Sequence, residues 1–168
     1  MKKLLNSPFF PWLLVLLWAA QIYFFSSFSS PIDFLPRFLV RILWRTIIFG
    51  QRLFFYMGVV GHFVNFAILA FLLARAFIWK GPLKRKCLIL AFAIACLYGV
   101  SDEIHQIFIP DRTFQVLDLL INSLGAAFGV FAFSYIHTNY SSIFTDGLKQ
   151  FWSSLGDKFT KQPPTKLP

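Results

Sequence analysis

The residues best suited to chemistry in this chain lie in the stretch SDEIHQIFIPDRTFQVLDLLINSLGAAFG, positions 101–129. It holds carboxylates at Asp102 and Glu103, followed by an imidazole at His105. These side chains can abstract, relay and donate protons. Either carboxylate would act as a general base, while His105 would move a proton or orient that base. The predicted catalytic residues are therefore Asp102, Glu103 and His105.

The same stretch carries polar side chains that could bind a ligand. Asp102, His105 and Gln106 are spaced three and four residues apart, so one helix face can carry all three. Glu103 is offset by one position and could face a different neighbour. Arg112 follows after a turn, where its guanidinium could hold a phosphate or a carboxylate.

A second polar stripe begins six residues after Arg112. Its members, Asp118, Asn122, Gly125 and Gly129, follow one another at steps of four, three and four, which places them on one helix face. The two glycines form a GxxxG pattern, which is typical of close helix packing in membranes. The earlier apolar segment over residues 57–79 adds two polar side chains, His62 and Asn65, three residues apart. The predicted ligand-binding residues are His62, Asn65, Gln106, Arg112, Asp118 and Asn122.

These residues have two other interpretations, a metal site and a structural ion-pair network. A metal ion could be held by His105, Glu103 and Asp118, but the chain has no ligand spacing as diagnostic as H-E-x-x-H. We therefore predict no metal and no cofactor. A purely structural role also stays open, in which an ion-pair network locks two helices together. Its members would be Asp102, Glu103, Arg112 and Asp118.

The elements that must position these residues are membrane helices. Of the 168 residues, 57% are hydrophobic and only 14% are charged, whereas a soluble domain usually carries about a quarter charged residues. Four apolar segments are long enough to cross a bilayer, which needs about 20 helical residues. Backbone groups in lipid must bond within the segment, so helices are expected, and strand-like alternation is absent. The segments cover about residues 8–28, 57–79, 87 onward into the polar stretch, and 115–137.

The depth of the acidic residues follows from the length of the third segment. Its charge-free part, residues 87–101, would rise about 22 Å as a helix, which is short of a hydrocarbon core of about 30 Å. The acids after it should therefore lie in the outer hydrocarbon zone. A charge there costs about 2.5–3.5 kcal/mol on insertion scales, so these groups should face protein or a wet cavity.

The net charge of +9 is interpreted as a topology signal, with no nucleic-acid partner expected. Of the 16 Lys and Arg residues, ten fall on the side of the two termini and five on the opposite side, and Arg75 lies near the inner end of the second segment. We expect both termini in the cytoplasm and the polar cluster at the extracytoplasmic side. The first segment is expected to stay as an uncleaved helix, because it is longer than a usual signal sequence and lacks a clear cleavage site.

Two further segments are amphipathic and are expected to lie in the membrane interface. In residues 33–52, the arginines at positions 37, 41, 45 and 52 share one face if a helix continues through Gly50. This arginine face would attract lipid phosphates or hold an anionic, lipid-linked ligand. The second segment, residues 142–159, gathers six large apolar side chains on one face: Phe144, Leu148, Phe151, Trp152, Leu155 and Phe159.

The order and spacing of the polar residues resemble the VanZ-like family of small bacterial membrane proteins. The shared pattern is D-E-x-H-Q, then Pro, Arg two residues later, then D-x-x-x-N-x-x-G-x-x-x-G. His62 is similar to the histidine of the family's second helix, although no acidic residue flanks it here. The resemblance covers roughly residues 8–137. The matching residues are Asp102, Glu103, His105, Gln106, Pro110, Arg112, Asp118, Asn122, Gly125 and Gly129.

The residue patterns and the resemblance together predict an all-α membrane protein with four transmembrane helices and two interfacial helices. Residues 1–140 would form the VanZ-like transmembrane domain and residues 141–168 a cytoplasmic amphipathic tail, in the bacterial cytoplasmic (inner) membrane. The founding member is associated with teicoplanin resistance, so a link to the cell envelope and to glycopeptide resistance is expected. We expect membrane lipids as partners, and a pocket that binds or acts on a lipid-linked or cell-envelope component. A non-enzymatic amphiphile binder, a partner subunit, and a small transporter or proton pathway stay open as alternatives.

Overall fold

The computed structural model describes residues 7–29, 35–79 and 81–160, with side chains described up to residue 139. The chain divides into two compact units, Met1–Ser134 and Tyr135–Pro168. The first unit contains all of the predicted site residues. In the second unit the backbone stays helical up to Thr160. The apolar face predicted for residues 142–159 lies outside the described side chains.

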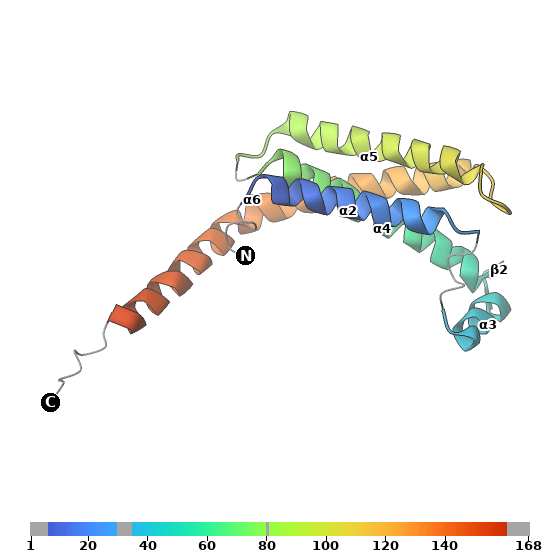
Figure 1. The fold of residues 1–168 in the computed structure, drawn as a ribbon, viewed down its shortest axis with the longest axis horizontal. Coiled ribbons are helices and arrows are strands. Elements are labelled where there is room, and N and C mark those ends of the chain that lie inside the picture. Colours follow the sequence, from blue (N-terminus) through green and yellow to red (C-terminus); the bar gives the residue numbers. More distant parts are fainter. Residues whose placement is uncertain (1–6, 30–34, 80, 161–168) are drawn as a thin grey trace. The chain divides into compact units, whose positions relative to one another are not determined.

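Four long apolar helices confirm the prediction of an all-α membrane protein. They are α2 (Phe9–Ser26), α4 (Leu53–Phe77), α5 (Arg85–Gln106) and α6 (Val116–Thr160), and in α6 the apolar span runs over Val116–Asn139. Within the first unit these helices lie alongside one another (Figure 1). Their bounds are within a few residues of the predicted segments, because about 20 apolar residues are needed to cross the hydrocarbon core.

Successive spans run in opposite directions, so one end of the bundle collects the end of α2, the start of α4, the end of α5 and the start of α6. We call this the site end. A side-chain hydrogen bond there joins the segment after α2 to the connection between α5 and α6, since the Arg112 guanidinium donates to the Phe28 carbonyl at 3.2 Å. The other end carries the basic residues Lys84–Lys86 at the start of α5. The polar residues and the basic loop thus lie at opposite ends of the bundle.

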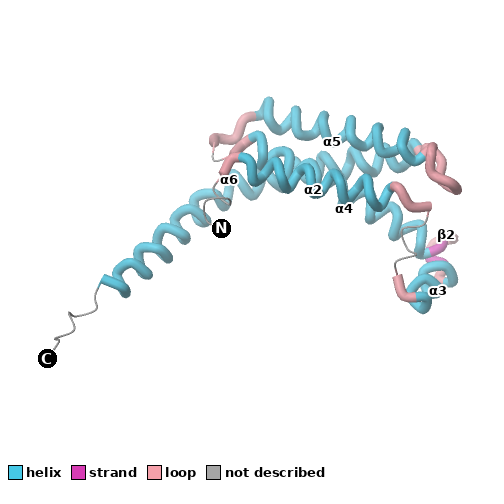
Figure 2. The backbone as a smooth tube through the Cα atoms, in the orientation of Figure 1, coloured by secondary structure: helices cyan, strands magenta, loops and turns pink. Residues whose placement is uncertain are grey.

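The predicted amphipathic helix over residues 33–52 is wrong beyond Arg45. Helix α3 covers only Arg37–Arg45, and two short strands follow, β1 (Ile47–Ile48) and β2 (Gln51–Arg52), which pair antiparallel (Figure 2). Residues 33 and 34 lie outside the described residues. Three of the four arginines therefore share an exposed helix face, while the fourth, Arg52, lies in the hairpin.

The hairpin forms because the backbone reverses at Phe49 and Gly50. Their φ angles are 49° and 79°, and a two-residue turn with φ > 0 at both positions matches the twist of paired strands. Ile47 and Ile48 are β-branched, which favours extended backbone over helix. Arg52 then packs its guanidinium carbon 4.8 Å from the ring centre of Trp44.

The GxxxG face of α6 packs directly against the backbone of α4, as predicted. A Cβ atom added at Gly125 would collide with the Phe63 carbonyl, and one added at Gly129 would collide with the Ala67 carbonyl. This close approach fixes the register of α6 against α4 near His62. Small side chains also lie in the core between the helices. Five alanines there are fully buried: Ala70, Ala74, Ala91, Ala95 and Ala126.

Candidate functional site

A cavity of about 530 Å³ opens at the site end of the first unit. Residues of α2, α4, α5, α6 and the connection over residues 107–115 line it. Its wall is partly aromatic and aliphatic, with Phe25, Phe54, Phe55, Met57 and Phe66 among the contributors. Eight of its polar lining residues come from segments far apart in the sequence: Gln21, Ser26, His62, Asn65, Asp102, Gln106, Arg112 and Asp118.

The pocket wall includes most of the predicted ligand-binding residues and one of the predicted catalytic residues. Of the ligand-binding set, only Asn122 is absent from the wall; it is buried, with 1% of its surface exposed. Of the catalytic set, Asp102 lines the cavity, whereas Glu103 is fully buried behind the wall. Of the three predicted catalytic residues, only Asp102 thus lies at the cavity surface.

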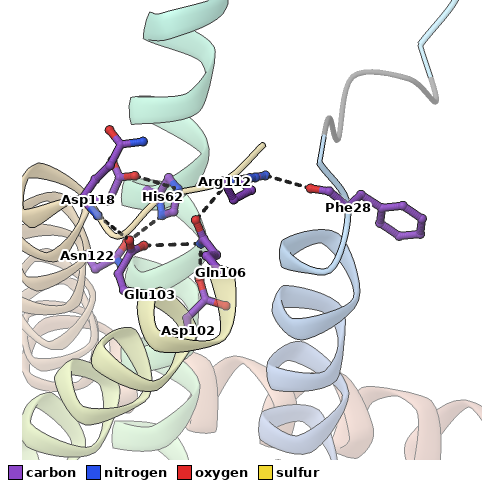
Figure 3. Close-up of polar contacts among 9 residues, drawn as sticks. Phe28, His62, Asp102, Glu103, Gln106, Arg112, Asp118 and Asn122 are labelled. Atoms are coloured by element: carbon purple, nitrogen blue, oxygen red, sulfur yellow. Dashed lines mark hydrogen bonds and ion pairs between the residues drawn. The ribbon is translucent and has the colours of Figure 1, made fainter. Parts of the chain in front are cut away.

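The two carboxylates of α5 are held by the same glutamine. Gln106 Nε2 donates to Asp102 Oδ2 at 3.1 Å and to Glu103 Oε1 at 3.4 Å (Figure 3). The backbone N–H of Gln115 donates to Glu103 Oε2 at 3.2 Å. This is the reason that a fully buried carboxylate is tolerated here, because each of its oxygens accepts a hydrogen bond. Of the three residues predicted to share one face of α5, Asp102 and Gln106 are in contact, whereas His105 contacts Ser27 and Tyr23.

His105 lies on the opposite side of α5 from Glu103, so the predicted partnership between them is wrong. Its Nε2 atom is 3.1 Å from Ser27 Oγ, and its ring stacks on Tyr23 with the ring centres 4.5 Å apart. The physical reason is helical periodicity: two residues separated by two positions point about 160° apart at about 100° per residue. His105 therefore ties α5 to α2.

His62 takes the place predicted for His105 in the acidic cluster. Its Nδ1 atom is 3.1 Å from Asn122 Oδ1, and its Nε2 atom is 3.7 Å from Asp118 Oδ2. His62, Glu103 and Asp118 each offer a ligand atom within 4.8 Å of the other two, so these three residues could hold a metal ion. Three helices, α4, α5 and α6, supply one residue each to this cluster.

The ion-pair network that stayed open as a structural alternative would need Arg112 to pair with an acid. Arg112 donates from one terminal nitrogen to Gln106 Oε1 and from the other to the Phe28 carbonyl, both at 3.2 Å. Among the residues that the structure describes, Arg112 forms no ion pair with an acid. Its guanidinium is directed toward the end of α2, as Figure 3 shows, away from the carboxylate of Asp118.

Buried polar atoms without a partner gather at the same cavity. Within the described side chains they are Gln21 Oε1, Ser26 Oγ, Arg112 Nε and Asn122 Nδ2, and the first three belong to residues of the cavity wall. Buried polar groups are nearly always paired, so such a concentration calls for a bound partner. Neither Gln21 nor Ser26 was among the residues predicted from the sequence to bind a ligand. A glutamine within an otherwise apolar span was the available signal.

The comparison with known families gives one match. The family model described as VanZ/LLP1 matches residues 10–137, which covers nearly all of the four spans and every residue of the cluster. The resemblance drawn from the D-E-x-H-Q pattern and the later stripe is therefore confirmed. No curated protein and no solved structure matches the chain.

Proposed function

This chain belongs to the VanZ/LLP1 family, and from that premise we propose that its site-end pocket binds the anionic headgroup of a lipid-linked or other cell-envelope amphiphile. One observation carries the proposal: three residues that line a single cavity beside apolar wall residues, Gln21, Ser26 and Arg112, each hold a buried polar atom that has no partner within the described side chains. Each such atom forfeits a hydrogen bond that a ligand can restore, and a buried unsatisfied group costs about 1–3 kcal/mol.

The polar wall favours a particular headgroup chemistry. Both terminal nitrogens of Arg112 already donate to neutral oxygens. Its Nε–H has no partner within the described side chains and can donate a charge-assisted hydrogen bond to a phosphate or carboxylate. Gln21 Oε1 is an acceptor and needs a donor. The acids Asp102 and Asp118 on the wall likewise need donors. The fitting headgroup therefore combines one anionic group with hydroxyl or amine groups.

The apolar wall favours a ligand with a hydrocarbon chain. Phe55 and Met57 line the cavity and are also 40% and 50% exposed on the outer surface of α4. In a membrane these exposed faces would contact lipid. A chain leaving the pocket past them would stay in the bilayer, so the headgroup could bind without the chain entering water.

Binding is favoured over proton-transfer catalysis by the placement of the predicted catalytic residues. Glu103 has no exposed surface, and His105 is turned toward α2. A general base must come within hydrogen-bond reach of the proton that it abstracts. Asp102 is the one predicted catalytic residue on the cavity wall, and Gln106 already donates to it at 3.1 Å.

We also propose the bacterial cytoplasmic membrane as the location, with both termini in the cytoplasm. The basic residues at the start of α5 lie at the bundle end opposite the pocket, and Lys and Arg are enriched in cytoplasmic loops. The pocket would then face the outer leaflet, where envelope precursors and lipophilic glycopeptides are met.

The test of this proposal is a lipid and precursor profile of a deletion strain, complemented with variants. Deletion should change the amount of an anionic, lipid-linked envelope component and shift teicoplanin susceptibility. Wild type should restore both, whereas Arg112→Gln should not, because it removes the cation of the pocket. Arg75→Gln is the matched control, since Arg75 is exposed and packs near Trp79, with 5.7 Å between its guanidinium carbon and the ring centre. Full restoration by Arg112→Gln would overturn the proposal.

His105→Gln should leave the lipid profile restored while lowering stability. The change removes the stacking on Tyr23 and alters the bond to Ser27, at a cost of about 1 kcal/mol. Thermal unfolding of the purified protein measures the stability, and the same complementation measures function. A folded His105→Gln protein that fails to complement would return His105 to the functional site.

A further inference from the structure

We propose that His62, Glu103 and Asp118 form a binding site for one divalent transition-metal ion. The site goes beyond the proposed amphiphile pocket and does not depend on it. Each residue offers a ligand atom within 4.8 Å of the other two, and His62 Nε2 lies 3.7 Å from Asp118 Oδ2. Ligand atoms on a tetrahedral ion with bonds of about 2.0–2.2 Å lie about 3.3–3.6 Å apart. Side-chain shifts of about 1 Å would therefore close the site around an ion.

The hydrogen bonding of His62 directs a lone pair toward the acids. Its Nδ1 atom faces Asn122 Oδ1 at 3.1 Å, and an amide oxygen only accepts, so Nδ1 carries the hydrogen. In a neutral imidazole, Nε2 is then an acceptor that faces the acceptor oxygen of Asp118. Two acceptors repel unless a proton or a metal cation lies between them, and the metal is the case proposed here. Metal-bound histidines typically donate their other N–H to an oxygen in this way.

The charge balance of the cluster also calls for a cation. Glu103 has no exposed surface and Asp118 is 9% exposed. Neither has a Lys or Arg ion-pair partner in the part of the chain that the structure describes, since Arg112 donates to Gln106 and Phe28 instead. Buried charges are stable when they are paired or bound to metals. One divalent ion would neutralise both carboxylates.

The surroundings of the cluster fit a metal site with an open position. Glu103 is oriented by Gln106 and His62 by Asn122, as Figure 3 shows. The backbone N–H of Gln115 also donates to Glu103. The Nδ2 atom of Asn122 is a donor without a partner among the described residues, on a side chain that is 99% buried. An oxygen of water or of an anion on the ion could accept from it. His62 and Asp118 line the pocket, so the fourth position would open into it.

The donor set selects the ion. One imidazole nitrogen and two carboxylates suit Zn²⁺ or Mn²⁺, whereas Ca²⁺ and Mg²⁺ prefer oxygen ligands in larger number. Three protein ligands with one open position are typical of catalytic zinc sites, whereas structural sites are closed by four. The ion would therefore be accessible to the headgroup of a ligand in the pocket.

The test is a Zn²⁺ titration of the purified, chelator-treated full chain by calorimetry. Wild type should bind one ion per chain, and Asp118→Asn and His62→Gln should weaken binding at least tenfold. Asp111→Asn is the matched control, because Asp111 is an exposed acid of the same pocket outside the cluster. Arg75→Gln, a charge change outside the pocket, should also bind Zn²⁺ normally. No binding by wild type, or equal binding by Asp118→Asn, would overturn the proposal.

A second measurement covers the case in which the cluster variants do not fold. Wild type loaded with Mn²⁺ should show, by pulsed electron paramagnetic resonance, magnetic coupling to one imidazole nitrogen. The coupling should persist in His105→Gln, since His105 contacts Ser27 and not the cluster. Mn²⁺ without nitrogen coupling, or coupling that disappears in His105→Gln, would overturn the assignment of His62.

Discussion

Gly61→Phe should abolish binding of an anionic amphiphile while leaving the bundle folded. Gly61 lines the pocket, and a Cβ atom built there meets nothing within 4 Å, so a ring can occupy the cavity without moving the backbone. The substitution also carries no helix-propensity cost, since glycine is the poorest helix former after proline. The expected effect is a loss of affinity of at least a hundredfold, because the ring and the headgroup compete for the same space.

Thermal unfolding in neutral detergent measures this prediction. Dioctanoyl phosphatidic acid should stabilise the wild type, by about 2.7 kcal/mol at a concentration 100 times the Kd, and dioctanoylglycerol, which lacks the phosphate, should not. Gly61→Phe should lose the stabilisation, whereas Gly61→Ala should keep it because the cavity stays open. If Gly61→Phe is stabilised as much as the wild type, the ligand does not bind in this pocket.

Gly129→Leu should prevent α6 from packing against α4. A Cβ atom at Gly129 collides with the backbone carbonyl of Ala67, which cannot move aside as a flexible side chain could. The helices must separate, and the contacts of Asn122 and Asp118 with His62 on the same faces would be lost with them. We expect a loss of about 4 kcal/mol or more, which places this change among the rare severe substitutions.

The level of folded protein in the membrane and the melting temperature of the purified chain check this expectation. Gly58→Leu is the matched control, because a Cβ atom at Gly58 on α4 meets open space. It makes the same glycine-to-leucine change without the collision. A Gly129→Leu protein that melts at the wild-type temperature would show that α6 does not depend on this close contact.

The spans and the close-packed face of α6 were predictable because each follows from a single physical requirement. Crossing the hydrocarbon needs about 20 apolar residues, and small residues four apart allow two backbones to approach. The hairpin after α3 was missed for an equally local reason. The arginine periodicity was extended through Gly50, although glycine readily adopts the positive φ that reverses the chain.

The composition of the site was only partly predictable, because helical spacing gives relative directions on one helix and not the neighbour that each side faces. It places Asp102 beside Gln106 and His105 away from Glu103, but it cannot tell which side meets α2. The pairing of His62 with Asp118 depends on the register that the glycines of α6 impose.

The contribution of α2 to the pocket was harder still to predict. Gln21 and Ser26 lie more than 80 residues from Arg112 in the sequence, and only packing brings them to the same cavity.

The most direct test of the ligand pocket is native mass spectrometry of the chain extracted gently from its own membrane. The wild type and Arg75→Gln should each carry one anionic lipid-like adduct per chain. Arg112→Gln should retain it at about a tenth of that occupancy or less, because a hydrogen bond from a charged group contributes about 1.5–3 kcal/mol. Equal adducts on the wild type and Arg112→Gln, or no anionic adduct on the wild type, would contradict a pocket that holds an anionic headgroup through this arginine.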